Sequence, residues 1–369
     1  MRPDVAIESV KAWAFKIPTD RPEADGTIAW DSTTLVLVEV SAGGEVGIGY
    51  TYSGASIVGL ICGKLARIVE GHDAFAPESA WLAMQRAVRN LGREGLAATA
   101  ISAVDTALYD LKARLLDLPL VRLLGSSRSS VLIYGSGGFT TYSDRELQRQ
   151  LGGWLADQGC GFVKMKVGSE PDRDPHRVKV AREAIGDRAM LFVDANGAYT
   201  QKQALGLADQ FAAQGVGWFE EPVSSDDLTG LKSVRRRAPE PMEVAAGEYA
   251  YTIDYVRTML QADAVDVQQA DVTRCGGITG FLQIAALCDA FHIDLSGHCA
   301  PALHLHVACA APRLRHLEWF HDHARIEHML FDGAPQPRDG RIAPDLSRPG
   351  NGLSFRHRDA ARYAVKGVA

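Results

Sequence analysis

The feature that most constrains the fold of this 369-residue chain is a series of short apolar runs separated by amphipathic helical patterns. Four of the runs occupy residues 161–166, 190–194, 216–220 and 242–248. Each run is typical of a strand that is buried on both faces of a parallel sheet. Strands and helices that alternate at a pitch of about 25 to 30 residues predict a β/α barrel, whose functional groups project from the C-terminal strand ends.

Three of these runs end in an acidic residue: Asp194, Glu220 and Glu248. Successive strand ends of a barrel face one another, so the three carboxylates are expected to converge. Carboxylate oxygens without companion His or Cys ligands favour a hard cation, with Mg²⁺ as the expected metal and Mn²⁺ as the alternative. One acid after a strand is more often a loop residue or a helix N-cap, but three acids in register predict a metal site.

The run before these acids ends in Lys164-Met165-Lys166, and side-chain alternation places both lysines on the same face, toward the predicted site. The charge of Lys164, together with the metal, is expected to lower the pKa of Lys166 and so make it a better base. Asp271 follows the sixth predicted strand and His298 the seventh. A carboxylate bonded to one imidazole nitrogen raises the basicity of the other, which makes His298 a candidate general base.

Glu318 ends the eighth predicted strand, in an apolar context where an unpaired carboxylate is costly. Two interpretations are open. A neutral Glu318 would donate a hydrogen bond to a developing oxyanion, whereas an ionised Glu318 would pair with Arg274 or a nearby His.

Composition narrows the class of protein. The net charge is -6 and no basic stripe is present, which argues against nucleic acid as a partner. No apolar run is long enough for a transmembrane helix and no signal segment is evident, so a soluble, cytoplasmic protein is expected. The six cysteines show no zinc-type spacing and are expected to be reduced and buried, although Cys299 follows His298 and could border the pocket.

The chain is expected to form three parts: a capping domain over residues 1–125, a barrel over residues 126–329, and a C-terminal segment over residues 330–369 that packs back on the cap. In the cap, alternation predicts antiparallel strands at 5–17 and 33–40 joined by a loop at 19–32. Helical patterns follow at 56–68, 79–90 and 96–116. The remaining barrel strands are predicted at 131–134, 264–268, 292–296 and 316–320.

The motifs occur in an order that resembles the mandelate racemase group of the enolase superfamily, and the resemblance covers nearly the whole chain. They are Lys164-x-Lys166, Asp194-x-Asn196, Glu220-Glu221-Pro222, Gly247-Glu248, Asp271 to Gly276-Gly277 and Ser296-Gly297-His298. The resemblance implies a modified (β/α)₇β TIM barrel under an N-terminal α+β capping domain, and usually a homo-oligomer.

The resemblance also implies roles for single residues. Asp194, Glu220 and Glu248 would be the Mg²⁺ ligands, with Asn196 and Glu221 close to the metal or its ligands. The acid/base groups would be Lys166 on one face and His298, paired with Asp271, on the other. Lys164 would be an electrostatic helper and Glu318 a hydrogen-bond donor to the enolate.

The shared chemistry implied by the resemblance is removal of a proton α to a carboxylate. Dehydration of a sugar acid to a 2-keto-3-deoxy acid is favoured by analogy, and a racemase or epimerase is the alternative. A cycloisomerase or dipeptide epimerase is disfavoured, because relatives of those kinds generally carry a Lys near the end of the sixth strand, where this chain has Asp271. A barrel that binds a carboxylate without catalysis is a third possibility, which intact acid/base residues on both faces argue against.

Polar residues in two candidate specificity loops, near 19–32 and 49–56, suit a hydroxylated substrate. They are Asp20, Arg21, Trp30, Asp31, Tyr50 and Tyr52. Arg274 offers a weaker indication, because it could meet a second carboxylate of a diacid or simply pair with Glu248 or Glu318.

Overall fold

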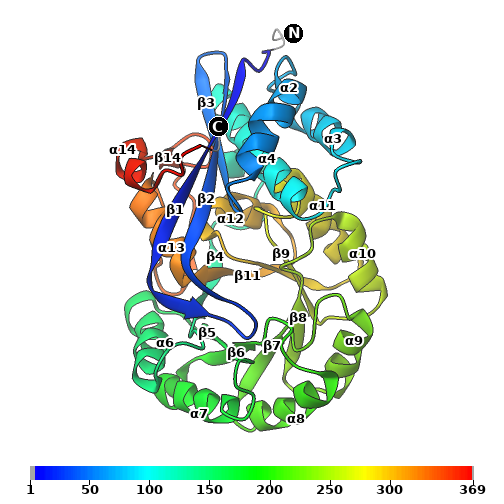
Figure 1. Cartoon of the computed structure of the whole chain (residues 1–369), viewed down its shortest axis with the longest axis vertical. Helices are drawn as coiled ribbons and strands as arrows, with labels where there is room; N and C mark the ends of the chain where they lie inside the picture. Colours follow the sequence, from blue (N-terminus) through cyan, green and yellow to red (C-terminus); the bar gives the residue numbers. More distant parts are fainter. Residues whose placement is uncertain (1–4, 368–369) are drawn as a thin grey trace.

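The computed structural model describes residues 5–367 and has a closed barrel of eight parallel strands beneath an antiparallel cap (Figure 1). The barrel strands are β4 Val131–Gly137, β5 Phe162–Lys166, β6 Met190–Asp194, β7 Val216–Glu220, β8 Glu243–Ala246, β9 Val267–Ala270, β10 Asp294–Gly297 and β11 Leu314–Phe320. They follow one another in sequence order round the barrel, and pairing of β11 with β4 closes it. The predicted fold class is therefore confirmed.

Seven helices connect these strands and cover the outside of the barrel, and an eighth follows β11. They are α6 Asp144–Gln158, α7 Asp174–Ile185, α8 Gln201–Ala212, α9 Leu228–Arg237, α10 Ile253–Gln261, α11 Gly277–Ala290, α12 Pro301–Ala310 and α13 His321–Leu330. A short 3-10 turn, η2 at Gly186–Arg188, extends α7. Two helices begin with a full capping box, Ser143 with Glu146 and Thr200 with Gln203, which satisfies the first free backbone N–H groups.

Aromatic side chains fill the barrel interior below the strand ends. Tyr134, Phe192 and Trp218 form a buried cluster, and His316 packs against all three rings. These residues precede Ser136, Asp194, Glu220 and Glu318 by two positions, so strand alternation stacks a polar layer directly on an aromatic one.

The cap consists of a three-stranded antiparallel sheet and a set of helices. Its elements are β1 Ser9–Ala24, β2 Ala29–Ala42, β3 Glu45–Tyr52, α1 Ile57–Leu60, η1 Ile61–Leu65, α2 Ala66–Val69, α3 Pro77–Ala87, α4 Leu96–Leu115 and α5 Leu120–Leu124. The apolar helix α4 packs directly on β3. A Cβ at Gly47 or Gly49 would lie 2.3 or 2.2 Å from a backbone oxygen of α4, so glycine is required at both positions for this close approach.

The predicted loop at 19–32 is wrong. Strands β1 and β2 continue through most of it as a long hairpin, with only residues 25–28 left as the turn and an irregularity between Pro18 and Glu23. The sequence is misleading here because the arm extends beyond the cap and is largely exposed, so it lacks the apolar alternation of a half-buried strand. The arm reaches over the barrel (Figure 1). A Cβ at Gly26, in the turn of the arm, would lie 2.6 Å from the carbonyl oxygens of both Val167 and Ala195, so the arm approaches the barrel backbone closely.

The second predicted loop, at 49–56, is partly wrong as well, because residues 49–52 belong to β3, a strand that the sequence interpretation missed. Strands β9 and β10 begin later than predicted, at Val267 and Asp294. The prediction of β9 followed the apolar pair Ala264-Val265, whereas the strand itself carries the polar pair Gln268-Gln269 into the buried interior.

The C-terminal segment packs on the barrel as well as on the cap. Its elements are β12 Phe331–Asp332, β13 Arg341–Ile342, β14 Ser354–Phe355, α14 His357–Ala360 and η3 Ala361–Tyr363. Strand β13 pairs with β4 of the barrel, while the backbone N–H of Asn351 donates to Asp110 of α4. Between residues 5 and 367, no helix combines the length and the apolar character that a membrane span needs.

Candidate active site

Three carboxylates converge at the C-terminal strand ends. Asp194 and Glu220 end β6 and β7 and are paired in the register of these strands. Glu248 follows β8 after Gly247, whose φ of +134° and close approach to the carbonyl of Gln269 exclude a side chain. One oxygen from each of the three acids lies within 4.8 Å of the other two, and all three residues are buried. Converging, buried oxygen donors of this kind fit a divalent cation of the magnesium class.

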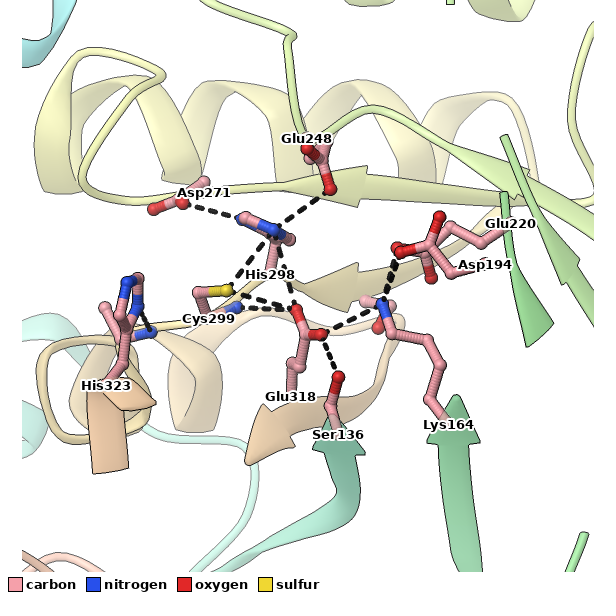
Figure 2. A network of polar contacts seen from close by, with 12 residues as sticks. Ser136, Lys164, Asp194, Glu220, Glu248, Asp271, His298, Cys299, Glu318 and His323 are labelled. Carbon is pink, nitrogen blue, oxygen red and sulfur yellow. Dashed lines mark hydrogen bonds and ion pairs between the residues drawn. The ribbon is translucent and has the colours of Figure 1, made fainter. Parts of the chain in front are cut away.

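Two buried lysines contact these acids. Lys164 Nζ lies 2.5 Å from Glu220 and 3.4 Å from Asp194, while Lys166 Nζ lies 2.5 Å from Asp194 (Figure 2 shows Lys164). Both lysines come from β5, two residues apart, as the alternation predicts. The ammonium groups compensate carboxylates that would otherwise be costly to bury together.

Among the protein's own groups the pKa of Lys166 is raised, and the expected lowering, which includes the charge of a bound metal, stays a prediction. Burial is the largest effect and works to lower this pKa, but the carboxylates of Asp194, Glu248 and Glu220 together raise it by more. Lys164 does lower the pKa of Lys166, as expected, yet its effect is smaller than that of Asp194. Burial followed by the charge of Asp194 raises the pKa of Glu220 to about 8, despite the ammonium of Lys164.

Asn196 and Glu221 lie beside the carboxylate cluster. The side-chain oxygen of Asn196 accepts a hydrogen bond from Lys166 at 3.1 Å, and its backbone N–H donates to Asp194 at 2.9 Å. Glu221 is buried, and its Oε1 has no hydrogen-bond partner among the residues from 5 to 367. Both residues adopt positive φ, a sparsely populated conformation that accumulates at functional sites.

His298 and Asp271 form a dyad at the ends of β10 and β9. His298 Nδ1 lies 2.8 Å from Asp271 Oδ2, and Thr273 donates its backbone N–H and its hydroxyl to the other oxygen of Asp271, both at 2.7 Å. Burial would raise the pKa of Asp271, but the hydrogen bond from His298 and its charge hold it well below the usual range. Asp271 is therefore an ionised acceptor that directs His298 Nε2 toward the three carboxylates.

The free nitrogen of His298 has several close neighbours (Figure 2). His298 Nε2 lies 3.1 Å from Glu248 Oε2, 3.3 Å from Cys299 Sγ and 3.7 Å from Glu318 Oε2. Burial works to lower the pKa of His298, but Cys299, Glu248 and Glu318 raise it.

Glu318 is an ionised acceptor and not the neutral donor that one interpretation proposed. It receives a hydrogen bond from Ser136 Oγ at 2.5 Å and from the backbone N–H of Cys299 at 3.0 Å, and it pairs with Lys164 at 2.9 Å. Burial would raise the pKa of Glu318, but Lys164 and then His298 hold it well below the usual range. The ionised interpretation holds: Lys164 is the main partner, and the expected pairing with a histidine is present as well, to His298 at 3.7 Å.

Arg274 is anchored in the site. Its Nη1 donates to the backbone carbonyl of Glu248 at 3.1 Å and lies 3.7 Å from the carboxylate, while its Nε lies 3.5 Å from Asp271. The side chain is 21% exposed. Arg274 therefore links the second half of the site to the predicted metal ligands, and no ion pair joins it to Glu318 within residues 5–367.

Three aromatic residues, Trp30, Tyr50 and Tyr52, were predicted to contact substrate, and for Tyr50 this prediction is wrong. Its side chain is fully buried, its hydroxyl donates to Glu327 at 2.6 Å, and its ring packs on Phe331. Tyr52 remains half-buried, stacked on the ring of His323 with 3.5 Å between centroids.

Trp30 belongs to the hairpin arm and reaches the edge of the site. Its indole N–H donates to Glu23 at 2.8 Å, and its ring packs with Phe139 in a cluster that includes Cys299 and Phe320. The polar residues of the arm instead contact the rim: Asp20 pairs with His321, Arg21 with Glu146, and Asp31 with its neighbour Ser32.

Two further residues lie at the site: Ser136 was not found from the sequence, and for His323 the sequence left substrate binding and solvent exposure open. Ser136, at the end of β4, donates to Glu318, and a signal for it existed because Ser136 occupies the inward register two residues beyond Tyr134. His323 lies in the first turn of α13, and its Nδ1 accepts the backbone N–H of Ala300 at 3.3 Å. Only the loop conformation of Cys299-Ala300, with positive φ at both residues, brings that N–H to His323, and no sequence pattern indicates this conformation.

Comparison with known proteins gives a consistent assignment. The mandelate racemase / muconate lactonizing enzyme N-terminal domain model matches residues 12–125, and the enolase C-terminal domain-like model matches residues 146–360. The chain is 32% identical to the 3,6-anhydro-alpha-L-galactonate cycloisomerase of Streptomyces coelicolor, over 97% of this chain and 99% of that protein. This relative is a cycloisomerase, a reaction that the sequence interpretation disfavoured.

Two solved structures extend the comparison. A mandelate racemase/muconate lactonizing enzyme-like protein from Rubrobacter xylanophilus has a TM-score of 0.96 and 52% identity, covering 98% of this chain and 100% of that one. The L-talarate/galactarate dehydratase of Salmonella typhimurium, liganded with Mg and L-lyxarohydroxamate, has a TM-score of 0.89 and 28% identity, covering 98% and 93%. Both family models and these full-length similarities place the chain in the mandelate racemase / muconate lactonizing enzyme family of the enolase superfamily.

Proposed function

We propose that this protein is a Mg²⁺-dependent enzyme that removes the proton α to the carboxylate of a sugar acid and then expels a β-oxygen, most simply as water. The observation that carries the proposal is the convergence of three buried carboxylates, two lysines and a His–Asp dyad at one end of the barrel. The product of dehydration would be a 2-keto-3-deoxy acid.

Asp194, Glu220 and Glu248 would hold the cation. Their oxygens are close enough to share one ion, and the buried Glu221 Oε1, which has no hydrogen-bond partner within residues 5–367, adds a polar atom beside the same cluster. A bound Mg²⁺ supplies positive charge that stabilises the developing negative charge on a substrate carboxylate.

The protein's own groups would move the protons. Lys166 Nζ and His298 Nε2 belong to the ends of strands β5 and β10 on different sides of the mouth, so each can address a different face of a substrate held between them. The fixed tautomer of His298 leaves Nε2 to exchange a proton with the α carbon or with the departing oxygen. A positioned acid or base is typically worth about 10²- to 10⁴-fold in rate.

Lys164 would stabilise charge without transferring a proton. It lies between Glu220 and Glu318, fully buried, where an ammonium acts at short range in a low-dielectric environment. Because Glu318 is an ionised acceptor held by Lys164 and Ser136, we assign it the role of orienting Lys164, in place of donation to the enolate.

A second candidate function is a cycloisomerase, favoured by the 32% identity with a cycloisomerase over nearly the whole chain. The two reactions share the removal of an α proton and the departure of a β-oxygen, which is a hydroxyl in dehydration and can be a ring oxygen in an anhydro sugar acid. Racemisation or epimerisation would instead return a proton from the opposite face.

The test is a screen of purified protein with Mg²⁺ against mono- and diacid sugars, anhydro sugar acids and lactones, run in D₂O. Formation of a 2-keto acid with loss of water supports dehydration, and ring opening or closure without loss of mass supports the cycloisomerase. Deuterium at the α carbon without either product reassigns the protein to racemisation. If acids from the library bind to the protein but none exchanges its α proton, the catalytic proposal is wrong. The protein is then a barrel that binds carboxylates without catalysis.

A further inference from the structure

A second group of potential metal ligands lies next to the three carboxylates. His298 Nε2, Cys299 Sγ and Glu318 Oε2 approach one another closely, and all three residues are buried. We call these three residues the His–Cys–Glu cluster. Imidazole and thiolate are ligands that Mg²⁺ avoids and that Zn²⁺ prefers.

The distances within the His–Cys–Glu cluster match the edges of a tetrahedral zinc site. The separations are 3.3 Å from Nε2 to Sγ, 3.4 Å from Sγ to Oε2 and 3.7 Å from Nε2 to Oε2. Bond lengths of about 2.3 Å to sulfur and about 2.0 to 2.2 Å to nitrogen and oxygen place tetrahedral ligand atoms about 3.3 to 3.6 Å apart. The three protein atoms are therefore already near the positions that one zinc ion requires.

Neighbouring groups orient the three ligands in the way that zinc sites commonly show. Asp271 holds His298 Nδ1 at 2.8 Å, the carboxylate–histidine arrangement that fixes Nε2 toward a metal. Ser136 and Lys164 both contact Glu318 Oε1, which leaves Oε2 to face Cys299. The sulfur is brought into the cluster by the left-handed conformation of Cys299, with φ of +53°.

We infer that the His–Cys–Glu cluster is a binding site for a thiophilic divalent cation of the zinc class, distinct from the three-carboxylate site. On binding, the Cys299 thiol releases its proton to solvent as the sulfur–metal bond forms, with no change in oxidation state. Three protein ligands leave a fourth position for water. Glu248 belongs to the three-carboxylate site, and its Oε2 lies 3.1 Å from His298 Nε2 of the His–Cys–Glu cluster. Its negative charge reduces the repulsion between cations in the two sites.

The consequence for activity rests on the proposed function. A cation on His298 Nε2 occupies the lone pair that would accept the proton, so zinc bound here would inhibit the enzyme while Mg²⁺ remained on the carboxylates. The binding test below does not depend on turnover, so failure of the cluster and failure of the proposed function can be told apart.

The experiment titrates Co²⁺ into the full-length protein saturated with Mg²⁺ under anaerobic conditions and records the near-ultraviolet charge-transfer band of cobalt bound to thiolate. We expect the band in the wild type and its loss in Cys299→Ser. Cys275→Ser is the matched control, since Cys275 is also buried but belongs to no ligand cluster within residues 5–367, and it should retain the band. Competition by Zn²⁺ should show an affinity at least about tenfold weaker in Cys299→Ser, since even an outer partner of a metal ligand is worth about 10- to 100-fold.

A wild-type titration without the thiolate band, or a band that persists in Cys299→Ser, would overturn the inference. If Cys299→Ser does not fold, cadmium NMR of the wild-type protein decides the same point. A resonance in the range of sites with one sulfur ligand supports the cluster, and a resonance in the oxygen-only range contradicts it.

Discussion

Two regions of this molecule bury carboxyl groups, and they differ in the cations that lie beside those groups. In both regions burial raises pKa values, as for Glu220 at the mouth, whose pKa is about 8. At the mouth of the barrel, Glu248, Asp271 and Glu318 have pKa values held below the usual range: burial opposes this, but His298 and nearby Lys or Arg cations outweigh it. At the junction of cap and barrel, Asp105 and Glu327 have no such cations among residues 5–367, and burial raises their pKa values to about 7 and about 8.

The junction carboxyls connect the two layers of the structure. Asp105 of α4 accepts two hydrogen bonds from Thr279 of α11, and Glu327 of α13 accepts one from Tyr50 of β3. Burial alone therefore does not set the charge of an acid. Neighbouring cations keep Glu248, Asp271 and Glu318 ionised at the mouth, whereas Asp105 and Glu327 at the junction are hydrogen-bonded acids whose protonation contributes to stability.

The largest expected effect is at the proton-transfer groups of the mouth. His298→Asn and Lys166→Ala should each lower α-proton exchange or turnover by about 10²- to 10⁴-fold, because each removes a positioned acid or base from one face of the substrate. The measurement is deuterium incorporation and steady-state turnover on the substrate that the screen identifies. Wild-type rates in both variants would contradict the mechanism proposed for the mouth.

The metal ligands provide the next test. Glu220→Gln removes one of three converging charges and should weaken Mg²⁺ binding by at least about tenfold, with all activities reduced together. Isothermal titration with Mg²⁺ measures the affinity directly, and Glu327→Gln is the control, as a buried acid outside the mouth. Unchanged Mg²⁺ affinity in Glu220→Gln would remove this residue from the ligand set.

The junction should make stability depend on pH. The pKa of Glu327 is about 8 in the folded protein against an ordinary value of 4.5, so the folded state binds this proton more tightly than the unfolded state. The stability that this proton contributes is fully present below pH 4.5 and is lost as the pH rises through about 8. We expect the free energy of unfolding to fall by an amount on the order of a few kcal/mol between these limits.

Denaturant unfolding from pH 5 to pH 9 measures this dependence. Glu327→Gln, which stays neutral, should reduce the slope, whereas the same change at the exposed Glu170 should leave it as in the wild type. An equal slope in Glu327→Gln would show that Glu327 is already ionised in the folded protein and would remove the contrast between mouth and junction.

The smallest effect concerns Tyr50. Tyr50→Phe removes one buried hydrogen bond to Glu327 and should lower the free energy of unfolding by about 0.5 to 1.5 kcal/mol, with KM unchanged. The measurement pairs denaturant unfolding with KM for the identified substrate. A higher KM with unchanged stability would restore Tyr50 as a substrate contact.

The barrel was predictable because its pattern is local and repeated. Apolar runs such as 190–194 and 216–220 end in acids at a nearly constant pitch, and side-chain alternation fixes which residues share a face. The hairpin arm was not predictable, because its outer residues face solvent and carry no apolar period. Strand β3 was missed because it is buried over residues 47–51 and carries Gly47 and Gly49, and glycine is uncommon in strands. The prediction that Tyr50 contacts substrate was wrong for a related reason. The local sequence around a tyrosine beside a loop is the same whether its side chain contacts substrate or packs under the cap.

For the candidate site, sequence order brought together Asp194, Glu220, Glu248 and Lys166 but did not assign charge states. Glu318 illustrates the limit, because its protonation depends on Lys164 and Ser136, which come from other strands. The pKa of Lys166 likewise depends on its neighbours, since the 2.5 Å contact with Asp194 outweighs the repulsion from Lys164.

The sequence by itself determined the strand-and-helix order, the family and the residue types at each strand end, since these depend on patterns within a few residues of one another. Only the tertiary structure decided which groups meet. The turn at Cys299-Ala300 brings the Cys299 thiol against His298 and Glu318, and burial of Glu327 beneath Tyr50 decides its charge. Such contacts join residues far apart in the chain, and their energies depend on short distances and local dielectric, which no local pattern records.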